Sequence, residues 1–140
     1  MGSSEAPAPK QISMRVTLEE ERAIRAAAAA LRLSLSDLVL LGGLEACHRM
    51  GLQNPRAVPA NLRPFTDAPV REASTRVTLN VRAPLLHHAL FSRAADLSDL
   101  PLSNFMVGAT LRSIARHQKL DPGDQRLAAV VLPRQYGGRR

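Results

Sequence analysis

The sequence predicts a mainly helical chain with one short two-stranded antiparallel ribbon, built from two copies of a strand, helix, helix unit. Two stretches, residues 11–17 and 76–82, alternate apolar and polar side chains with the period of a β-strand. Each is followed by two segments whose apolar residues have helical spacing. The chain is 45% hydrophobic but only 3% aromatic, so its core must be aliphatic, which favours helices over a large sheet.

Prolines, glycines and changes in composition divide the 140 residues into five segments. Small, polar and proline-containing residues predict a disordered arm at the start, and a basic, glycine-containing sequence predicts a flexible tail at the end. Four prolines, at positions 55, 59, 64 and 69, exclude a helix between the two units. The expected segments are the arm (1–9), the first unit (10–50), the linker (51–73), the second unit (74–118) and the tail (119–140).

The first unit begins with "QISMRVT", in which Ile12, Met14 and Val16 share one face. Thr17 and Glu20 then have the spacing of a capping box, which predicts a helix from Leu18. The apolar face of that helix is expected to comprise Ile24, Ala27, Ala28 and Leu31.

A second capping pattern, Ser34 with Asp37, predicts another helix through "LSDLVLLGGLEACHRM". Gly42 and Gly43 lie inside this helix, where each glycine costs about 1 kcal/mol relative to alanine. They would allow another backbone to approach closely.

The second unit repeats the first. Residues 76–82 match residues 11–17, and "LPLSNFMVGATLRSIARH" matches "LSLSDLVLLGGLEACHRM". The residue numbers of corresponding positions differ by 65 in the strand, 66 in the first helix and 67 in the second helix. This growing offset predicts single-residue insertions at two turns. The first helix of this copy is expected to begin near Pro84, with an apolar face of Leu86, Leu90, Ala94 and Leu97.

An isolated strand is not stable in water, so we expect the two strands to pair with each other as an antiparallel ribbon. Their apolar side chains would then pack on the helices. The polar side chains would form an exposed face of Gln11, Ser13, Arg15, Arg76, Thr78 and Asn80. An alternating strand more often belongs to the core of a sheet, but the duplicated context favours an exposed ribbon here.

These motifs resemble the ribbon-helix-helix family of DNA-binding proteins, the Arc and MetJ group, and they do so twice. "QISMRVT" followed by "LSLSD", and "TRVTLNV" followed by "LPLSN", are similar to that family's strand and the start of its second helix. The resemblance covers about 85 of 140 residues. It implies a tandem ribbon-helix-helix protein that folds as one intramolecular pseudo-dimer and places its ribbon in the major groove of double-stranded DNA.

The side chains on the polar face suit contacts to base edges. Arg15 and Arg76 can bind guanine, Gln11 and Asn80 can bind adenine, and the hydroxyl groups of Ser13 and Thr78 can bind either. The two strands carry different triplets, so we expect a non-palindromic site.

Phosphate contacts are expected from the starts of the second helices, where backbone N–H groups favour anions. The candidate residues are Ser34, Ser36, Ser103 and Arg82. Pro101 replaces Ser34 in the second copy and removes one donor, which weakens the prediction there.

Charge and composition favour nucleic acid as the partner. Lys and Arg number 19 against 12 Asp and Glu, for a net charge of +7, and 17 of the 19 are Arg, the better residue for bidentate contacts.

The single Cys47 permits no internal disulfide, and it is expected to be a small core residue. His87 and His88 diverge on a helix, so we expect no metal and no cofactor. No titratable pair has catalytic spacing, so an enzyme is not expected.

Two functional hypotheses remain open. The first is a DNA-binding protein that represses transcription or serves as an accessory factor at a plasmid or T-DNA transfer origin, with a relaxase or transfer machinery as partner; tandem units resemble such accessory proteins. The second is an antitoxin that binds a toxin through residues 120–140, because the first unit also resembles antitoxins paired with acetyltransferase toxins. The expected location is the bacterial cytoplasm, at the nucleoid or a plasmid, without a membrane span. A dimer of chains with two ribbons is an alternative to the fused pseudo-dimer.

Overall fold

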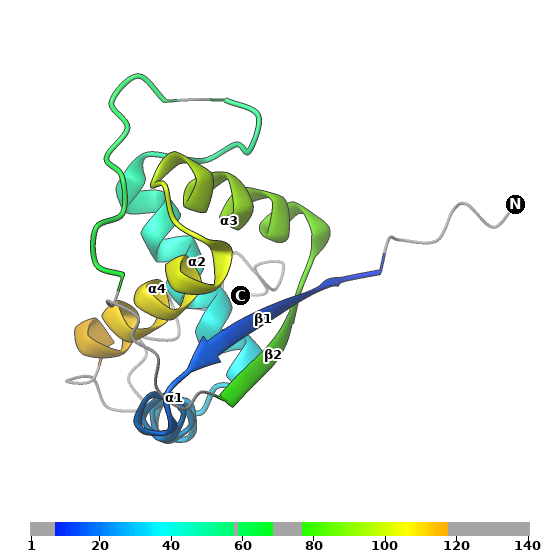
Figure 1. Cartoon of the computed structure of the whole chain (residues 1–140), viewed down its shortest axis with the longest axis vertical. Coiled ribbons are helices and arrows are strands. Elements are labelled where there is room, and N and C mark those ends of the chain that lie inside the picture. The colour runs from blue at the N-terminus through cyan, green and yellow to red at the C-terminus, as the bar shows by residue number, and fades with distance from the viewer. Residues whose placement is uncertain (1–7, 58, 69–76, 118–140) are drawn as a thin grey trace, which may run out of the picture.

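The chain forms a mostly helical α+β structure with a two-stranded antiparallel sheet, as expected (Figure 1). The computed structural model describes residues 8–57, 59–68 and 77–117. Most of the predicted arm, the end of the linker, the tail and Arg76 lie outside these described residues. The described elements are β1 (Lys10–Val16), α1 (Leu18–Leu31), α2 (Leu35–Met50), β2 (Val77–Ala83), α3 (Leu85–Leu97) and α4 (Leu102–His117).

The two strands form a ribbon in which Ser13 pairs with Asn80 at the centre. The apolar side chains of the alternating pattern turn inward, and Ile12, Met14, Val16, Leu79 and Val81 are all buried. Figure 1 shows α1 at one end of the ribbon and α3 at the other. Each strand leads directly into the helix at its own end.

The first strand is shifted by one residue from its predicted range. It begins at Lys10 and ends at Val16, because Thr17 serves as the N-cap of α1. The Thr17 hydroxyl accepts a hydrogen bond from the Glu20 backbone N–H at 3.1 Å, and the Thr17 N–H donates to the Glu20 carboxylate at 2.9 Å. The predicted capping box and the predicted helix start at Leu18 are therefore confirmed.

The backbone shows that the two copies keep one constant offset of 67 residues. The N–H of Leu33 donates to the carbonyl of Ala28, and the N–H of Leu100 donates to Ala95, each at 2.9 Å. Arg32 and Asp99, at the same place in each copy, both adopt φ 59°. The corresponding residues of the two copies are 67 apart, and so are those of the central ribbon pair, Ser13 and Asn80. The offset of 65 predicted for the strand, and the insertions predicted at two turns, were therefore wrong, because one cap residue, Thr17 or Pro84, separates strand from helix in each copy.

The offset of 66 predicted for the first helix was wrong, and this error changes which side chains of α3 are inside. At an offset of 67, Phe91 corresponds to Ile24, and both are fully buried. Leu90 and Ala94 are buried as expected, but Leu86 is 69% exposed. One residue of register turns a helix by about 100°, which is enough to move Leu86 to the surface.

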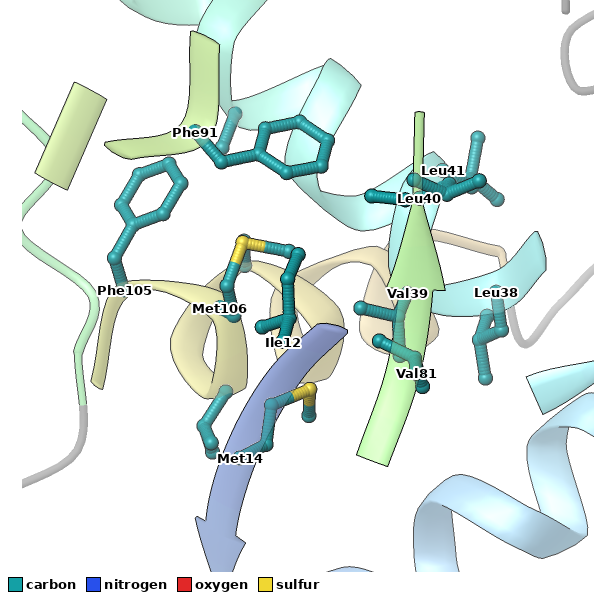
Figure 2. Close-up of a cluster of buried hydrophobic side chains, with 14 of the residues drawn as sticks. Ile12, Met14, Leu38, Val39, Leu40, Leu41, Val81, Phe91, Phe105 and Met106 are labelled. Carbon is teal, nitrogen blue, oxygen red and sulfur yellow. The ribbon is translucent and has the colours of Figure 1, made fainter. Parts of the chain in front are cut away.

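Helices α2 and α4 cross at the glycine pair. A Cβ atom on Gly42 would lie 2.8 Å from the Cα of Thr110 and 2.9 Å from the carbonyl oxygen of Ala109. A Cβ atom on Gly43 would lie 2.7 Å from the ring of Phe91. The predicted close backbone approach is confirmed. Figure 2 shows the core beside this crossing, where side chains from both strands meet those of α2, α3 and α4.

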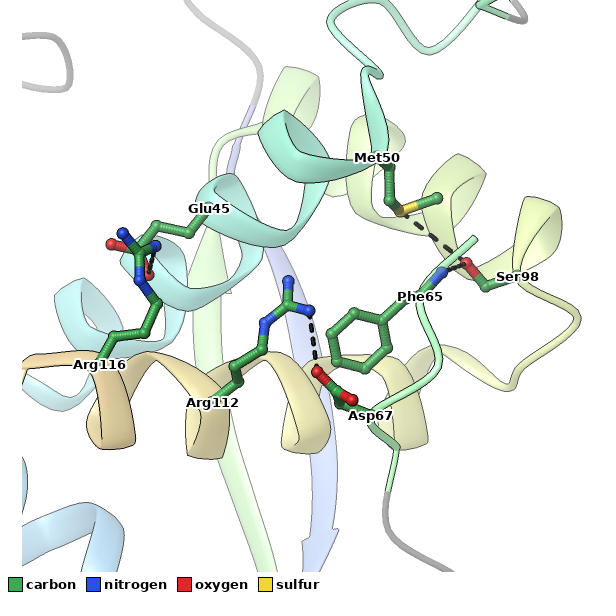
Figure 3. Close-up of polar contacts among 7 residues, drawn as sticks. All are labelled: Glu45, Met50, Phe65, Asp67, Ser98, Arg112 and Arg116. Carbon is green, nitrogen blue, oxygen red and sulfur yellow. Dashed lines mark hydrogen bonds and ion pairs between the residues drawn. The ribbon is translucent and has the colours of Figure 1, made fainter. Parts of the chain in front are cut away.

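The proline-rich segment has no helix or strand in its described parts, residues 51–57 and 59–68, as its prolines predict. It nevertheless packs on the helices, because Leu52 and Phe65 are buried. The Phe65 ring packs edge-on against Phe105, with centroids 5.2 Å apart. The Phe65 N–H donates to the Ser98 hydroxyl at 2.9 Å (Figure 3). The segment is thus part of the core rather than a simple spacer.

Within the described ranges, no single helix is long and apolar enough to cross a membrane.

Candidate nucleic-acid interface

The outward face of the ribbon is polar throughout. The register places Gln11 opposite Arg82, Ser13 opposite Asn80, and Arg15 opposite Thr78, and all six residues are exposed. We call these six residues the ribbon face. Five of the six predicted base-contacting residues belong to it, while Arg76 lies outside the described residues. Arg82, which was predicted to contact phosphate, also lies on this face, opposite Gln11.

Hydrogen bonds hold part of the ribbon face in a fixed arrangement. The Ser13 hydroxyl donates to the Asn80 amide oxygen at 2.8 Å, and the Gln11 amide donates to the Ser13 hydroxyl at 3.4 Å. Because its oxygen is fixed by Ser13, the Asn80 amide group is oriented across the ribbon. Ordered side chains lose less conformational entropy when they bind a ligand.

The start of α4 is tied to the ribbon. The backbone N–H of Arg15 donates to the Ser103 hydroxyl at 3.0 Å, so the second residue of α4 lies against β1. A serine hydroxyl that accepts a bond still has its own proton to donate. Ser103 can therefore hold the strand and bind a further acceptor at the same time.

The start of α2 has a side-chain cap, unlike the start of α4. The Ser34 hydroxyl accepts a hydrogen bond from the Asp37 N–H at 3.0 Å and so serves as the N-cap, with Ser36 partly exposed in the first turn. At the same place in α4, the carbonyl of Pro101 accepts the first helical bond from Phe105 at 3.0 Å. The two second helices therefore begin with unlike chemistry.

Charges near the ribbon are distributed unevenly. Lys10, Arg15 and Arg82 are exposed on the strands. The first turn of α1 contains Glu19, Glu20 and Glu21, whereas the first turn of α3 contains no acidic residue. The end of the ribbon next to α3 is consequently the more positive one.

Burial affects several titratable groups outside the ribbon face. Cys47 is buried, and burial raises the pKa of its thiol to about 12, so it is a poor nucleophile. Burial lowers the pKa of His87, and burial together with the charge of Lys10 lowers the pKa of His88. In the described part of the chain, no three His, Cys, Asp or Glu side chains are grouped so that they could hold a metal ion.

A partly buried cluster of polar contacts joins α2 to the end of α4, and no sequence pattern predicted it. The carboxylate of Glu45 lies 2.6 Å from Nε2 of His117 and 3.3 Å from Arg116 (Figure 3 shows the Arg116 contact). Arg112 similarly pairs with Asp67 at 3.0 Å and lies 4.6 Å from the centroid of the Phe65 ring. Each pair joins residues far apart in the sequence, where no local pattern links them.

Comparison with protein-family models, curated proteins and solved structures found no match to this chain. The function must therefore be inferred from the geometry and chemistry of the chain itself.

Proposed function

We propose that this protein is a tandem ribbon-helix-helix pseudo-dimer that binds double-stranded DNA through the ribbon face. The observation that carries the proposal is the ribbon face itself. Strands from the two halves of the chain present six exposed polar side chains in register, backed by a buried apolar layer. A two-stranded ribbon fits the major groove, where each base pair presents a distinct pattern of donors and acceptors.

Each residue of the face has a chemical role in this proposal. Arg15 donates two hydrogen bonds to guanine, while the Gln11 and Asn80 amides pair with adenine. Ser13 and Thr78 bind either base type, and Arg82, at the end of the ribbon, contacts a base or a flanking phosphate. Each good bidentate contact contributes about 1–3 kcal/mol of discrimination.

The helix starts supply the phosphate contacts. Backbone N–H groups in the first turns of α2 and α4 attract anions, and the hydroxyls of Ser34, Ser36 and Ser103 lie at these turns. The net charge of +7 adds a sequence-independent attraction that weakens with salt. The unlike strands favour a non-palindromic site, as expected for a regulator of transcription or an accessory protein at a transfer origin.

A selection of bound duplexes from a random pool tests the proposal. The wild-type chain is expected to enrich an asymmetric motif. Arg15→Ala and Asn80→Ala are each expected to relax the base preference, at different positions of the DNA motif. Arg49→Ala, at an exposed position on α2, is the control and is expected to retain the motif. Failure to enrich any motif at low salt, or a motif that both ribbon variants retain, contradicts the proposal.

A further inference from the structure

The two helices that follow the strands, α1 and α3, begin with surfaces of unlike chemistry. At the offset of 67, Leu18 of α1 corresponds to Leu85 of α3, and Glu19 corresponds to Leu86. In the described ranges, three large hydrophobic residues are exposed, and all three lie here: Leu18 at 46%, Leu85 at 39% and Leu86 at 69%. The same position of the repeat is therefore acidic in α1, as Glu19, and apolar in α3, as Leu86.

Beside α3 the surface is hollow. A groove of about 490 Å³ lies between this helix and the proline-rich segment. It is lined by Leu44, Pro55, Arg56, Leu86, His87 and Leu90, among others. The guanidinium of Arg56 has no carboxylate partner in the described part of the chain, and the buried Nδ1 of His87 has no hydrogen-bond partner there. The groove thus combines apolar side chains with the positive charge of Arg56, which has no carboxylate partner among the described residues.

The first turn of α1 carries an apolar side chain and a charge opposite to that of Arg56. Glu20 is held in the capping box, and Glu21 pairs with Arg25 at 3.0 Å. Glu19 is exposed and has no partner among the described residues, directly beside the half-exposed Leu18. This turn therefore presents a leucine side chain next to a free carboxylate.

We propose that the groove binds the Leu18–Glu19 turn of a second copy of this chain. Leu18 of one copy packs on Leu86 and Leu90 of the next, and its Glu19 carboxylate pairs with the guanidinium of Arg56. The charges on the two surfaces are complementary, and both surfaces lie on the same molecule, so a second copy satisfies both.

The two surfaces differ, so the contact is heterologous. A heterologous contact leaves one surface of each kind free at the ends of the assembly, so further copies add head to tail until the assembly closes into a ring or extends as a filament. The contact uses no residue of the ribbon face, so it leaves that face open and does not depend on DNA binding. A contact with few apolar side chains suits weak, reversible association.

Sedimentation velocity of the full chain without DNA, from about 1 μM to about 1 mM, tests this contact. The average mass is expected to rise with concentration past that of a dimer. Glu19→Arg and Arg56→Glu each place like charges across the contact and are expected to weaken association about tenfold or more. An equal mixture of these two variants restores both opposite-charge pairs and is expected to associate again. Arg63→Glu, the same charge change outside the groove lining, serves as the control.

Three results would overturn the proposal: a chain that stays monomeric at about 1 mM, association that stops at a dimer, or association that both charge reversals leave unchanged. Glu19 and Arg56 are exposed, and circular dichroism of each variant shows whether its fold is retained. Because no DNA is present and the ribbon face is intact in every variant, failure here leaves the proposed function separately testable.

Discussion

Replacement of Gly42 by alanine tests the helix crossing on which the ribbon packs. The added Cβ atom would lie 2.8 Å from Cα of Thr110 and 2.9 Å from the carbonyl oxygen of Ala109. Both are backbone atoms of α4, so no side-chain rotation relieves the contact and the helices must move apart.

The expected loss follows from two opposing terms. Overpacking of a tight core costs about 1–3 kcal/mol, and the upper end applies where backbone must move. Alanine in place of glycine within a helix stabilises the folded state by about 1 kcal/mol, which offsets part of this cost. We therefore expect Gly42→Ala to lower the free energy of unfolding by about 2 kcal/mol, measured by urea denaturation followed by circular dichroism.

Gly43→Ala is the matched comparison. Its Cβ atom would meet the Phe91 ring at 2.7 Å and the terminal methyl group of Met106 at 3.1 Å. Both are side-chain atoms that can repack, so we expect a smaller loss than at Gly42. A Gly42→Ala protein as stable as wild type, or more stable, would refute the close approach of α2 and α4.

Three further predictions concern the cap, the thiol and the histidines. Thr17→Ala removes the capping box with Glu20 and is expected to cost about 1 kcal/mol in urea unfolding, whereas an unchanged midpoint would argue against the cap. The Cys47 thiol, with its pKa raised to about 12 by burial, is expected to resist alkylation at pH 8 until denaturant is added; rapid labelling of the folded protein would contradict this burial. Because burial lowers the pKa of His87 in the folded state, the unfolded chain binds more protons below the usual histidine pKa of about 6.5. Stability should therefore fall as pH decreases through this range, and His87→Leu should reduce the slope; an unchanged slope would refute it.

Local patterns predicted most of the secondary structure. The alternation of Ile12, Met14 and Val16 predicted the inward face of β1, and the spacing of Thr17 and Glu20 predicted the start of α1. These signals are local, because a strand's period and a capping box involve neighbours in the chain.

Features that depend on distant contacts could not be predicted in the same way. Aligning Leu90 rather than Phe91 with Ile24 placed Leu86 on the wrong face, because the register of the copies follows from the matching bounds of their strands and helices in the structure. Phe65 lay among prolines, and nothing in its neighbourhood indicated that it packs against Phe105.

For the ribbon face, alternation predicted which side chains point outward. It could not predict their partners across the ribbon, which depend on the pairing register. The bond between Ser13 and Asn80, and the position of Arg82 beside Gln11, follow from that register.

The most direct test of DNA binding by the ribbon is an NMR titration of the ¹⁵N-labelled chain with a duplex recovered from the selection. We expect the amide and side-chain signals of the ribbon face, and the amides at the starts of α2 and α4, to shift or broaden at low DNA ratios. Signals of the α3 groove and of the described proline-rich segment should move little. Changes centred on those two regions, or no change at low salt, would contradict DNA binding by the ribbon face.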